Sequence, residues 1–274
     1  MDLVRASHLY KVFGKHEREV IERLKAGESR EDLASLGTAA VIDVSFEVAK
    51  GETFVVMGLS GSGKSTLIRM INGLWAPSEG TVEVAGKVVS DMNDAQLREL
   101  RRDHVSMVFQ HFALLPHLTV RENAAYGLKL QGKLKPKDRL EKANEWLHTV
   151  GLKGWGDKYP HQLSGGMQQR VGLARALAAE TDILLMDEAF SALDPLIRRE
   201  MQDQLLELQS TLNKTIIFIT HDLNEAMYLG DHIAVMRNGR VAQIGTSDEI
   251  LTQPADDYVA DFVQDVDRSR VLTE

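Results

Sequence analysis

The stretch Gly58 to Thr66 reads GLSGSGKST, and it comes directly after the apolar run TFVVM at Thr53 to Met57. A short, continuous apolar run is typical of a parallel strand that is buried on both faces. The residues that follow the stretch, LIRMINGL, are predicted to continue as a helix. A glycine-rich turn between a buried strand and a helix is the context that the phosphate-binding pattern GxxxxGK[ST] requires. The stretch therefore predicts a phosphate site on an α/β fold.

Each residue type in this P-loop pattern has a chemical reason. Glycines let the backbone approach phosphates closely, and amides at the start of a helix point at the anion. The Lys64 ammonium would contact the β- and γ-phosphates, and the Ser65 hydroxyl would bind Mg²⁺. A turn that only caps a helix is the alternative, which the full match in its proper context disfavours. The predicted nucleotide contacts are Gly58, Ser60, Gly61, Ser62, Gly63, Lys64, Ser65 and Thr66.

Composition narrows the class of protein. The chain has 274 residues, a net charge of -8 and no cysteine. This length is ample for one large domain, and the acidic balance disfavours a grip on nucleic acid through its phosphates. The absence of cysteine excludes disulfides, thiolate nucleophiles and zinc sites with cysteine ligands. No apolar run approaches the roughly 20 residues of a membrane helix, so we expect a cytosolic chain unless a partner recruits it to a membrane.

Short apolar runs recur along the chain and predict a sheet. Helical stretches lie between many of them, which favours an α/β fold with a largely parallel sheet. Between residues 111 and 160 the pattern changes, because two helical stretches follow each other without a strand. That segment is predicted to form a helical lobe. The expected strands are residues 3–9, 41–48, 53–57, 81–86, 105–109, 182–187, 215–220 and 232–236.

A charged segment interrupts the first strands. Val20, Ile21 and Leu24 fall on one helical face, and Ser29 with Asp32 resembles a capping box for a second short helix. We therefore expect a helical hairpin inserted within residues 15–38. A solvated excursion without a binding role is the alternative interpretation.

A P-loop needs an acid that holds the metal ion, and the run ILLMDE at Ile183 to Glu188 supplies a candidate. The apolar part predicts a buried strand, which places Asp187 at the carboxyl edge of the sheet, where ligands bind in this architecture. Asp187 would hold Mg²⁺, and Glu188 would orient and deprotonate the attacking water. The alternative for Glu188, a solvated loop acid, is disfavoured by its position beside Asp187.

Four further features follow in a fixed order. They are Gln110 after the run VSMVF, the segment LSGGMQQR at Leu163 to Arg170, SALD at Ser191 to Asp194, and His221 after the run TIIFIT. Together with the P-loop they resemble the nucleotide-binding subunit of an ABC transporter over nearly the whole chain. The resemblance implies a RecA-like P-loop NTPase core, an antiparallel β subdomain and an inserted α-helical subdomain.

The resemblance also implies roles for single residues. Two subunits would pair head to tail, so that Ser164, Gly165 and Gly166 meet the nucleotide held by the partner's P-loop. A plain helix cap is the alternative for this segment. One departure is Met167, where the common family form has glutamine. The remaining implied roles belong to Gln110, which would sense Mg²⁺ and water, His221, which would contact the γ-phosphate, and Asp194, which would shape the dimer contact.

The adenine contact is less sharply defined. The resemblance points to Phe13 as the ring that stacks on the base, and Tyr10 competes for this role. A phenylalanine that packs in the core is the other alternative.

Details of the sequence resemble a particular group of importers, the quaternary-amine uptake group, whose substrates are glycine betaine, proline betaine or choline. Leu59 in the P-loop and Ala189–Phe190 after Glu188 are points of likeness. The implied partners are a second copy of the chain, permease subunits and, through the permease, an extracytoplasmic binding protein. The chain would work as a peripheral ATPase on the cytoplasmic face of the membrane, using ATP and Mg²⁺.

The expected organisation is a single ABC ATPase domain. Its core would comprise residues 1–110 and 161–250, its helical subdomain 111–160, and its tail 251–274, without the CBS modules that many members of the group carry. The apolar segment from Gln110 to Asn123 is expected to line a groove for a permease helix. Two other functions stay open from the sequence: a soluble ABC-type ATPase acting on nucleic acid or ribosomes, and an ATP-binding scaffold that does not hydrolyse.

Overall fold

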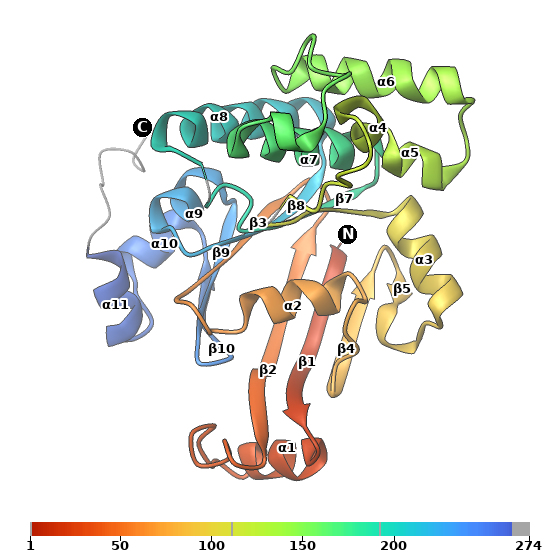
Figure 1. Cartoon of the computed structure of the whole chain (residues 1–274). Helices are drawn as coiled ribbons and strands as arrows, with labels where there is room; N and C mark the ends of the chain where they lie inside the picture. Colours follow the sequence, from red (N-terminus) through yellow and green to blue (C-terminus); the bar gives the residue numbers. More distant parts are fainter. Residues whose placement is uncertain (1, 111, 192, 265–274) are drawn as a thin grey trace. The chain divides into compact units, whose positions relative to one another are not determined.

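The computed structural model describes residues 2–110, 112–191 and 193–264 of the chain (Figure 1). It divides into two compact units, one made of Met1–Asn93 with Ile217–Glu274 and the other of Asp94–Ile216. None of the described helices has both the length and the apolar character needed to cross a membrane.

The first unit contains an antiparallel sheet of four strands, as the family resemblance implied. Its strands follow the order β2-β1-β4-β5. In β2 the buried side chains of Val44, Phe46 and Val48 alternate with exposed ones, so one face of the strand packs against the core. The strand bounds are β1 (Asp2–Gly14), β2 (Gly37–Ala49), β4 (Glu79–Val84) and β5 (Lys87–Val88).

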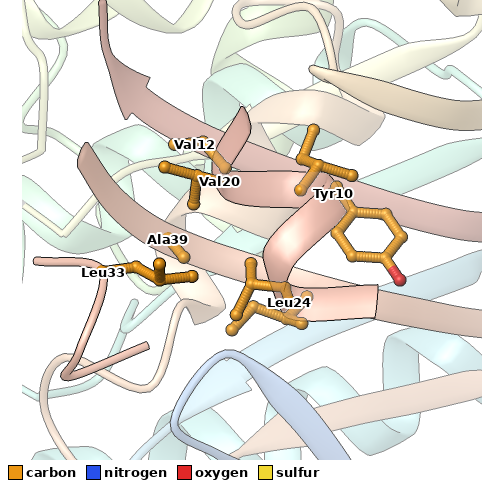
Figure 2. Packing of buried hydrophobic residues seen from close by; sticks show 8 residues of the cluster. Tyr10, Val12, Val20, Leu24, Leu33 and Ala39 are labelled. Carbon is orange, nitrogen blue, oxygen red and sulfur yellow. The ribbon is translucent and has the colours of Figure 1, made fainter. Parts of the chain in front are cut away.

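The inserted segment forms one helix, α1 (Glu17–Lys25), which lies across the ends of β1 and β2 (Figure 1). Figure 2 shows that Val20 and Leu24 point from this helix into a buried cluster with Tyr10, Val12, Leu33 and Ala39. The apolar helical face predicted from the sequence therefore exists, and it is buried against residues of β1, β2 and the turn at Leu33.

The predicted second helix of the insertion does not form. The Ser29 hydroxyl accepts a hydrogen bond from the Asp32 amide at 3.2 Å, as a capping box requires, but the residues that follow form turns. The Leu33 carbonyl accepts hydrogen bonds from the amides of both Leu36 and Gly37, so the chain turns directly into β2. A helix this short gains too few hydrogen bonds to offset its nucleation cost.

The first unit also contains strands of the order β10-β9-β3-β8. Strands β3 and β9 are parallel, and β9 and β10 form an antiparallel pair. Every residue of β3 is buried, as its apolar sequence predicted. The strand bounds are β3 (Thr53–Met57), β8 (Thr215–Thr220, in this unit from Ile217 onward), β9 (His232–Arg237) and β10 (Arg240–Gly245).

The helices of the first unit follow its strands. The P-loop leads from β3 into α2, and the predicted tail 251–274 contains a helix, α11; residues 265–274 of that tail lie outside the described residues. The bounds are α2 (Lys64–Ile71), a 3-10 turn η1 (Val89–Asp91), α9 (Leu223–Leu229), α10 (Ser247–Thr252) and α11 (Asp257–Val263).

The second unit contains the parallel strand pair β6 (Val105–Val108) and β7 (Ile183–Asp187). The predicted helical lobe falls in this unit, and the described residues from 112 to 160 contain helices and no strand. The helices of the unit are α3 (Asp94–Asp103), α4 (Val120–Ala124), α5 (Tyr126–Gln131), α6 (Pro136–Thr149), the 3-10 turn η2 (Pro160–Gln162), α7 (Gly165–Ala178) and α8 (Pro195–Leu212).

Candidate nucleotide-binding site

The P-loop joins the end of β3 to the start of α2 and is organised around a buried cation. The Lys64 side chain is only 4% exposed. Its Nζ donates hydrogen bonds to the carbonyls of Gly58 at 2.8 Å and Leu59 at 3.1 Å. The ammonium is therefore fixed against the loop that carries it. A buried positive charge at the start of a helix, where the helix dipole adds to it, favours an anion.

Two glycines of the loop have no room for a side chain. A Cβ on Gly58 would lie 2.3 Å from the Met236 carbonyl oxygen, and one on Gly63 would lie 2.2 Å from the Ala40 carbonyl oxygen. Gly63 also has a φ of 103°, which side-chain-bearing residues rarely adopt. The loop is thus packed against the backbones of β9 and β2, which holds its amides in place.

The P-loop also contains a buried hydroxyl group without a hydrogen-bond partner. Ser62 is buried, and its Oγ has no hydrogen-bond partner. A buried polar atom of this kind needs an explanation, and a bound anion at the loop supplies one. The remaining predicted contacts, Ser60, Gly61, Ser65 and Thr66, lie on the same turn and the first turn of α2. These observations fit a phosphate group.

The structure separates the two aromatic candidates for the adenine contact. Tyr10 is 5% exposed and packs beneath α1 in the cluster of Figure 2. Phe13 is 38% exposed, so its ring is accessible at the end of β1. The Phe13 ring meets the Trp75 ring edge to face at a centroid distance of 5.1 Å. Of the two residues, only Phe13 has an exposed ring, over which the Lys11 ammonium lies at 5.3 Å from the centroid.

Trp75 is a residue that the sequence reasoning missed. The Arg69 guanidinium of α2 lies 4.8 Å from the centroid of the Trp75 ring, so Trp75 links Phe13 to the helix that follows the P-loop. It belongs to no motif, and its only sequence signal was an aromatic residue shortly after the P-loop helix.

His221 follows β8 directly and is exposed. The next residue, Asp222, begins α9 as its N-cap and accepts hydrogen bonds from the Asn224 and Glu225 amides. The capped turn fixes the backbone immediately after His221. The predicted γ-phosphate contact is therefore an accessible side chain at the end of a buried strand.

In the second unit, Gln110 and Glu188 meet. Gln110 follows β6 and Glu188 follows β7, and the two strands are parallel neighbours. The Gln110 Nε2 donates a hydrogen bond to the Glu188 Oε2 at 3.1 Å. Asp187, the last residue of β7, is 3% exposed. Two carboxylates and a carboxamide thus lie at the carboxyl edge of this strand pair, where the sequence placed Asp187.

Glu188 has an unusual backbone conformation. Its φ is 46°, in the left-handed region that few residues other than glycine adopt. The Ser191 hydroxyl donates a hydrogen bond to the Glu188 carbonyl at 2.9 Å, which holds the turn closed. Local strain of this kind persists only where the surrounding structure determines the conformation, and it is common at catalytic positions.

The segment LSGGMQQR, the signature segment, runs from Leu163 to Arg170 and leads into α7. Ser164 is the N-cap of this helix, and its hydroxyl accepts a hydrogen bond from the Met167 amide at 3.3 Å. Gly165 and Gly166 form the first turn, whose amides have no partners within the helix. Asp194 likewise caps α8, by accepting a hydrogen bond from the Ile197 amide at 3.1 Å. Ser164 therefore has the helix-capping role that was its alternative, and Asp194 caps α8 in the same way. The amides of Gly165 and Gly166 lie at the start of α7 and have no partner within the helix.

The donor set suits Mg²⁺ rather than a softer metal. In the first unit the Ser65 hydroxyl offers an oxygen. In the second unit the Gln110 side-chain carbonyl and the Asp187 carboxylate do so, and oxygen is the ligand type that Mg²⁺ prefers. The described residues contain no group of three or more histidines and acids that could hold a metal ion by themselves. Mg²⁺ bound at either set of oxygens would take further ligands from phosphate and water.

The fold and these sites define an ATP-binding cassette. Residues 41–191 match the family model described as ABC transporter. In structure, the chain is similar to the dimeric ATP-binding cassette MJ0796 bound to ADP and Pi, with a TM-score of 0.77 and 32% sequence identity, covering 89% of this chain and 98% of that one. The chain belongs to the ABC transporter family, and its fold is that of the nucleotide-binding cassette.

Within the family, the chain resembles betaine transport proteins. It is 54% identical over 272 residues to the glycine betaine transport ATP-binding protein OpuAA of Bacillus subtilis, covering 98% of this chain and 65% of that protein. It is 53% identical over 271 residues to the glycine betaine/proline betaine transport system ATP-binding protein ProV of Escherichia coli, covering 97% of this chain and 67% of that protein. The chain thus spans about two thirds of the length of these relatives.

Proposed function

We propose that the chain binds and hydrolyses ATP to power an importer of quaternary amines of the glycine betaine, proline betaine or choline class. The observation that carries the ATPase part is the hydrogen bond of 3.1 Å between Gln110 and Glu188, beside the buried carboxylate of Asp187. A general base must be held within reach of the proton that it removes. In this arrangement Gln110 holds the Glu188 carboxylate, which takes a proton from the attacking water.

The P-loop residues bind and orient the triphosphate. Lys64 and the amides of the loop offset the negative charge of the phosphates, and the Ser62 hydroxyl gains the partner that it lacks. Ser65 and Asp187 would hold Mg²⁺, with Gln110 as a further ligand. When bound, Mg²⁺ neutralises charge that develops on the phosphate oxygens. His221 contacts the γ-phosphate, and Phe13 stacks on the adenine.

A second copy completes the site. The first-turn amides of α7 at Gly165 and Gly166, with the Ser164 hydroxyl, form an anion-binding helix start that the protomer's own P-loop does not require. In the proposed head-to-tail dimer they contact the γ-phosphate of the partner's nucleotide, and Asp194 shapes the contact. Only intact ATP reaches both protomers, so ATP closes the dimer and hydrolysis opens it. The dimeric form of MJ0796 bound to ADP and Pi supports the pairing of two cassettes.

The transport part rests on the relatives. OpuAA and ProV are named as glycine betaine transport ATP-binding proteins, and each is more than half identical to nearly all of this chain. We place the chain as a peripheral subunit on the cytoplasmic face of the membrane, bound to permease subunits that receive substrate from an extracytoplasmic binding protein. This supports the importer over an ATPase that acts on nucleic acid or ribosomes.

The test is reconstitution of transport. The chain, its permease subunits and the binding protein are reconstituted in liposomes, and uptake of radiolabelled glycine betaine is followed with ATP inside. Uptake that requires ATP and stops when Lys64→Ala replaces the wild-type chain is the expected result. ATP hydrolysis without uptake of glycine betaine, proline betaine or choline would overturn the substrate assignment while leaving the ATPase assignment in place.

A further inference from the structure

Helix α7 does more than present the signature residues at its start, because one of its faces lies against Phe112. A Cβ on Gly165 would be 3.7 Å from Cζ of the Phe112 ring, and a Cβ on Gly172 would be 3.6 Å from the Phe112 carbonyl oxygen. These are ordinary packing distances. The small residues of α7 therefore let this helix and the segment pack closely together.

Arg175, on the same helix, holds this segment by two hydrogen bonds. Its Nη1 donates to the Ala113 carbonyl at 2.6 Å, and its Nη2 donates to the Phe112 carbonyl at 3.0 Å. A guanidinium presents its donors in a rigid planar fork, so two such bonds fix both distance and orientation. A lysine at this position could not reproduce that geometry.

The segment held by Arg175 has a strained backbone. Phe112 has a φ of 56° and Ala113 a φ of 48°, both in the left-handed region. Two adjacent residues with side chains in this region need outside support to stay there. The donors of Arg175 reach the carbonyls of just these two residues. The strained turn and its support thus lie on different elements of the second unit.

The hydrogen-bond partners of Arg175 among the described residues are backbone carbonyls and not carboxylates. Burial lowers the pKa of its guanidinium, and no carboxylate contributes to raising it again. A guanidinium nevertheless stays protonated in proteins, so its charge is balanced here by carbonyl dipoles. Packing alone does not explain Arg175, because an uncharged side chain would fill the same space without the cost of partly burying a charge.

We propose that Arg175 is a positioning residue for ATP hydrolysis, which fixes the turn at Phe112 and Ala113 and thereby holds Gln110 against Glu188. The inference rests on the proposed function. It ties the signature helix of one protomer to the water-activating carboxylate of the same protomer. Engagement of the signature by the partner's nucleotide would then reach Glu188 through Arg175.

The chain offers a matched control on the same helix. Arg170 donates from Nη2 to the Glu200 carboxylate at 3.0 Å and from Nη1 to the Val150 carbonyl at 3.4 Å. It is therefore an arginine of α7 with partners away from the turn at Phe112 and Ala113. The substitutions Arg175→Lys and Arg170→Lys remove the same chemical group from different contacts.

The experiment is a double-mutant cycle on the steady-state hydrolysis of MgATP. Arg175→Lys should lower kcat by roughly 10-fold to 100-fold, as misplacement of a reacting group does, with KM for ATP within about twofold because Lys64 and its loop are unchanged. In a Gln110→Ala background the same substitution should change kcat by less than about twofold, because Arg175 acts through Gln110. Arg170→Lys should show no such dependence on Gln110.

A second pair of variants tests the turn without touching α7. Ala113 is exposed, so a larger side chain there meets solvent. Ala113→Val should lower kcat, since a β-branched residue disfavours a φ of 48°. Ala113→Gly, which accepts this φ freely, should keep kcat within about twofold of wild type. This pair decides the matter if Arg175→Lys does not fold.

Each result has a clear consequence. A folded Arg175→Lys with wild-type kcat, or a loss that is the same with and without Gln110, would overturn the role of Arg175 while the proposed function stands. If only the Ala113 pair can be measured, equal rates for Val and Gly would overturn it. A wild-type chain that does not hydrolyse MgATP would overturn the proposed function, and this inference with it.

Discussion

The Gln110 Nε2 lies 3.1 Å from the Glu188 Oε2, so a side chain just beyond one strand of the parallel pair holds the carboxylate just beyond the other. Glu188 is at the same time fixed in a left-handed backbone conformation. The carboxylate is thus positioned both through its own backbone and through its neighbour, which is the arrangement expected of a general base.

Replacement of Glu188 by glutamine should remove the base and leave the shape of the site unchanged. We expect kcat for MgATP to fall roughly 10²-fold to 10⁴-fold, and the protein to accumulate as an ATP-bound dimer. Phosphate release and size-exclusion chromatography with ATP measure these two effects. The matched control is Glu207→Gln, an exposed acid on α8, which should keep the wild-type rate. Wild-type turnover by Glu188→Gln would refute the catalytic role.

Lys64→Ala should weaken ATP binding. The ammonium is buried and makes charge-assisted hydrogen bonds to Gly58 and Leu59, so its loss removes the cation and loosens the loop. Bonds to charged groups contribute about 1.5–3 kcal/mol, which corresponds to roughly a 10-fold to 100-fold weaker Kd. Titration with a fluorescent ATP analogue measures this. Lys50→Ala, at an exposed turn before β3, is the control and should bind as wild type does.

Phe13 and Tyr10 should respond differently to truncation. Phe13→Ala should weaken ATP binding by about 1–3 kcal/mol, the usual contribution of stacking on a base, and Phe13→Tyr should restore it. Tyr10→Ala should instead lower the free energy of unfolding by about 3–5 kcal/mol, because Tyr10 lies in the buried cluster under α1. Binding titrations and urea unfolding separate the two. If Phe13→Ala binds ATP with unchanged affinity, Phe13 does not stack on the adenine.

The insertion should contribute to stability through α1. Leu24 is 4% exposed within the cluster of Figure 2. Leu24→Ala should therefore lower the free energy of unfolding by about 2–5 kcal/mol. Arg18→Ala, on the exposed side of the same helix, should change it by less than about 0.5 kcal/mol. If both variants unfold at the wild-type urea concentration, the cluster is not a structural core.

The apolar segment between Gln110 and Asn123 should couple hydrolysis to transport. The buried Asn123 accepts a hydrogen bond from the Leu115 amide at 2.8 Å and donates one to the Leu115 carbonyl at 3.0 Å, so the backbone there is fixed. Leu115→Asp should abolish uptake in the reconstituted importer and leave basal ATPase activity intact. Loss of both activities together would contradict a coupling role for this segment.

The sequence was sufficient for the parts of the fold that follow from local pattern. The apolar runs at Thr53–Met57 and Thr215–Thr220 have the bounds that the strands have in the structure. Strand β10 and helix α3 were not predicted, because their polar residues give no continuous apolar run. The second helix of the insertion was predicted wrongly, because the capping signal at Ser29 is local, whereas the return of the chain into β2 is not.

In the site, too, the features that could be predicted are local in the sequence, and those that could not be predicted depend on distant contacts. The P-loop, Asp187 and the signature segment are contiguous motifs, so the sequence located them. Contacts between segments far apart in the sequence gave no signal, and these include the packing of Trp75 on Phe13 and the hydrogen bonds from Arg175. The choice between Tyr10 and Phe13 required burial, which depends on how the insertion packs.

The central claim is tested most directly by capture of tagged Glu188→Gln protein with ATP from detergent-solubilised native membranes, followed by identification of its partners by mass. We expect a multi-span permease in the eluate, together with an extracytoplasmic binding protein that binds a quaternary amine. Recovery of ribosomal proteins or DNA-bound factors in place of a permease would contradict the importer assignment.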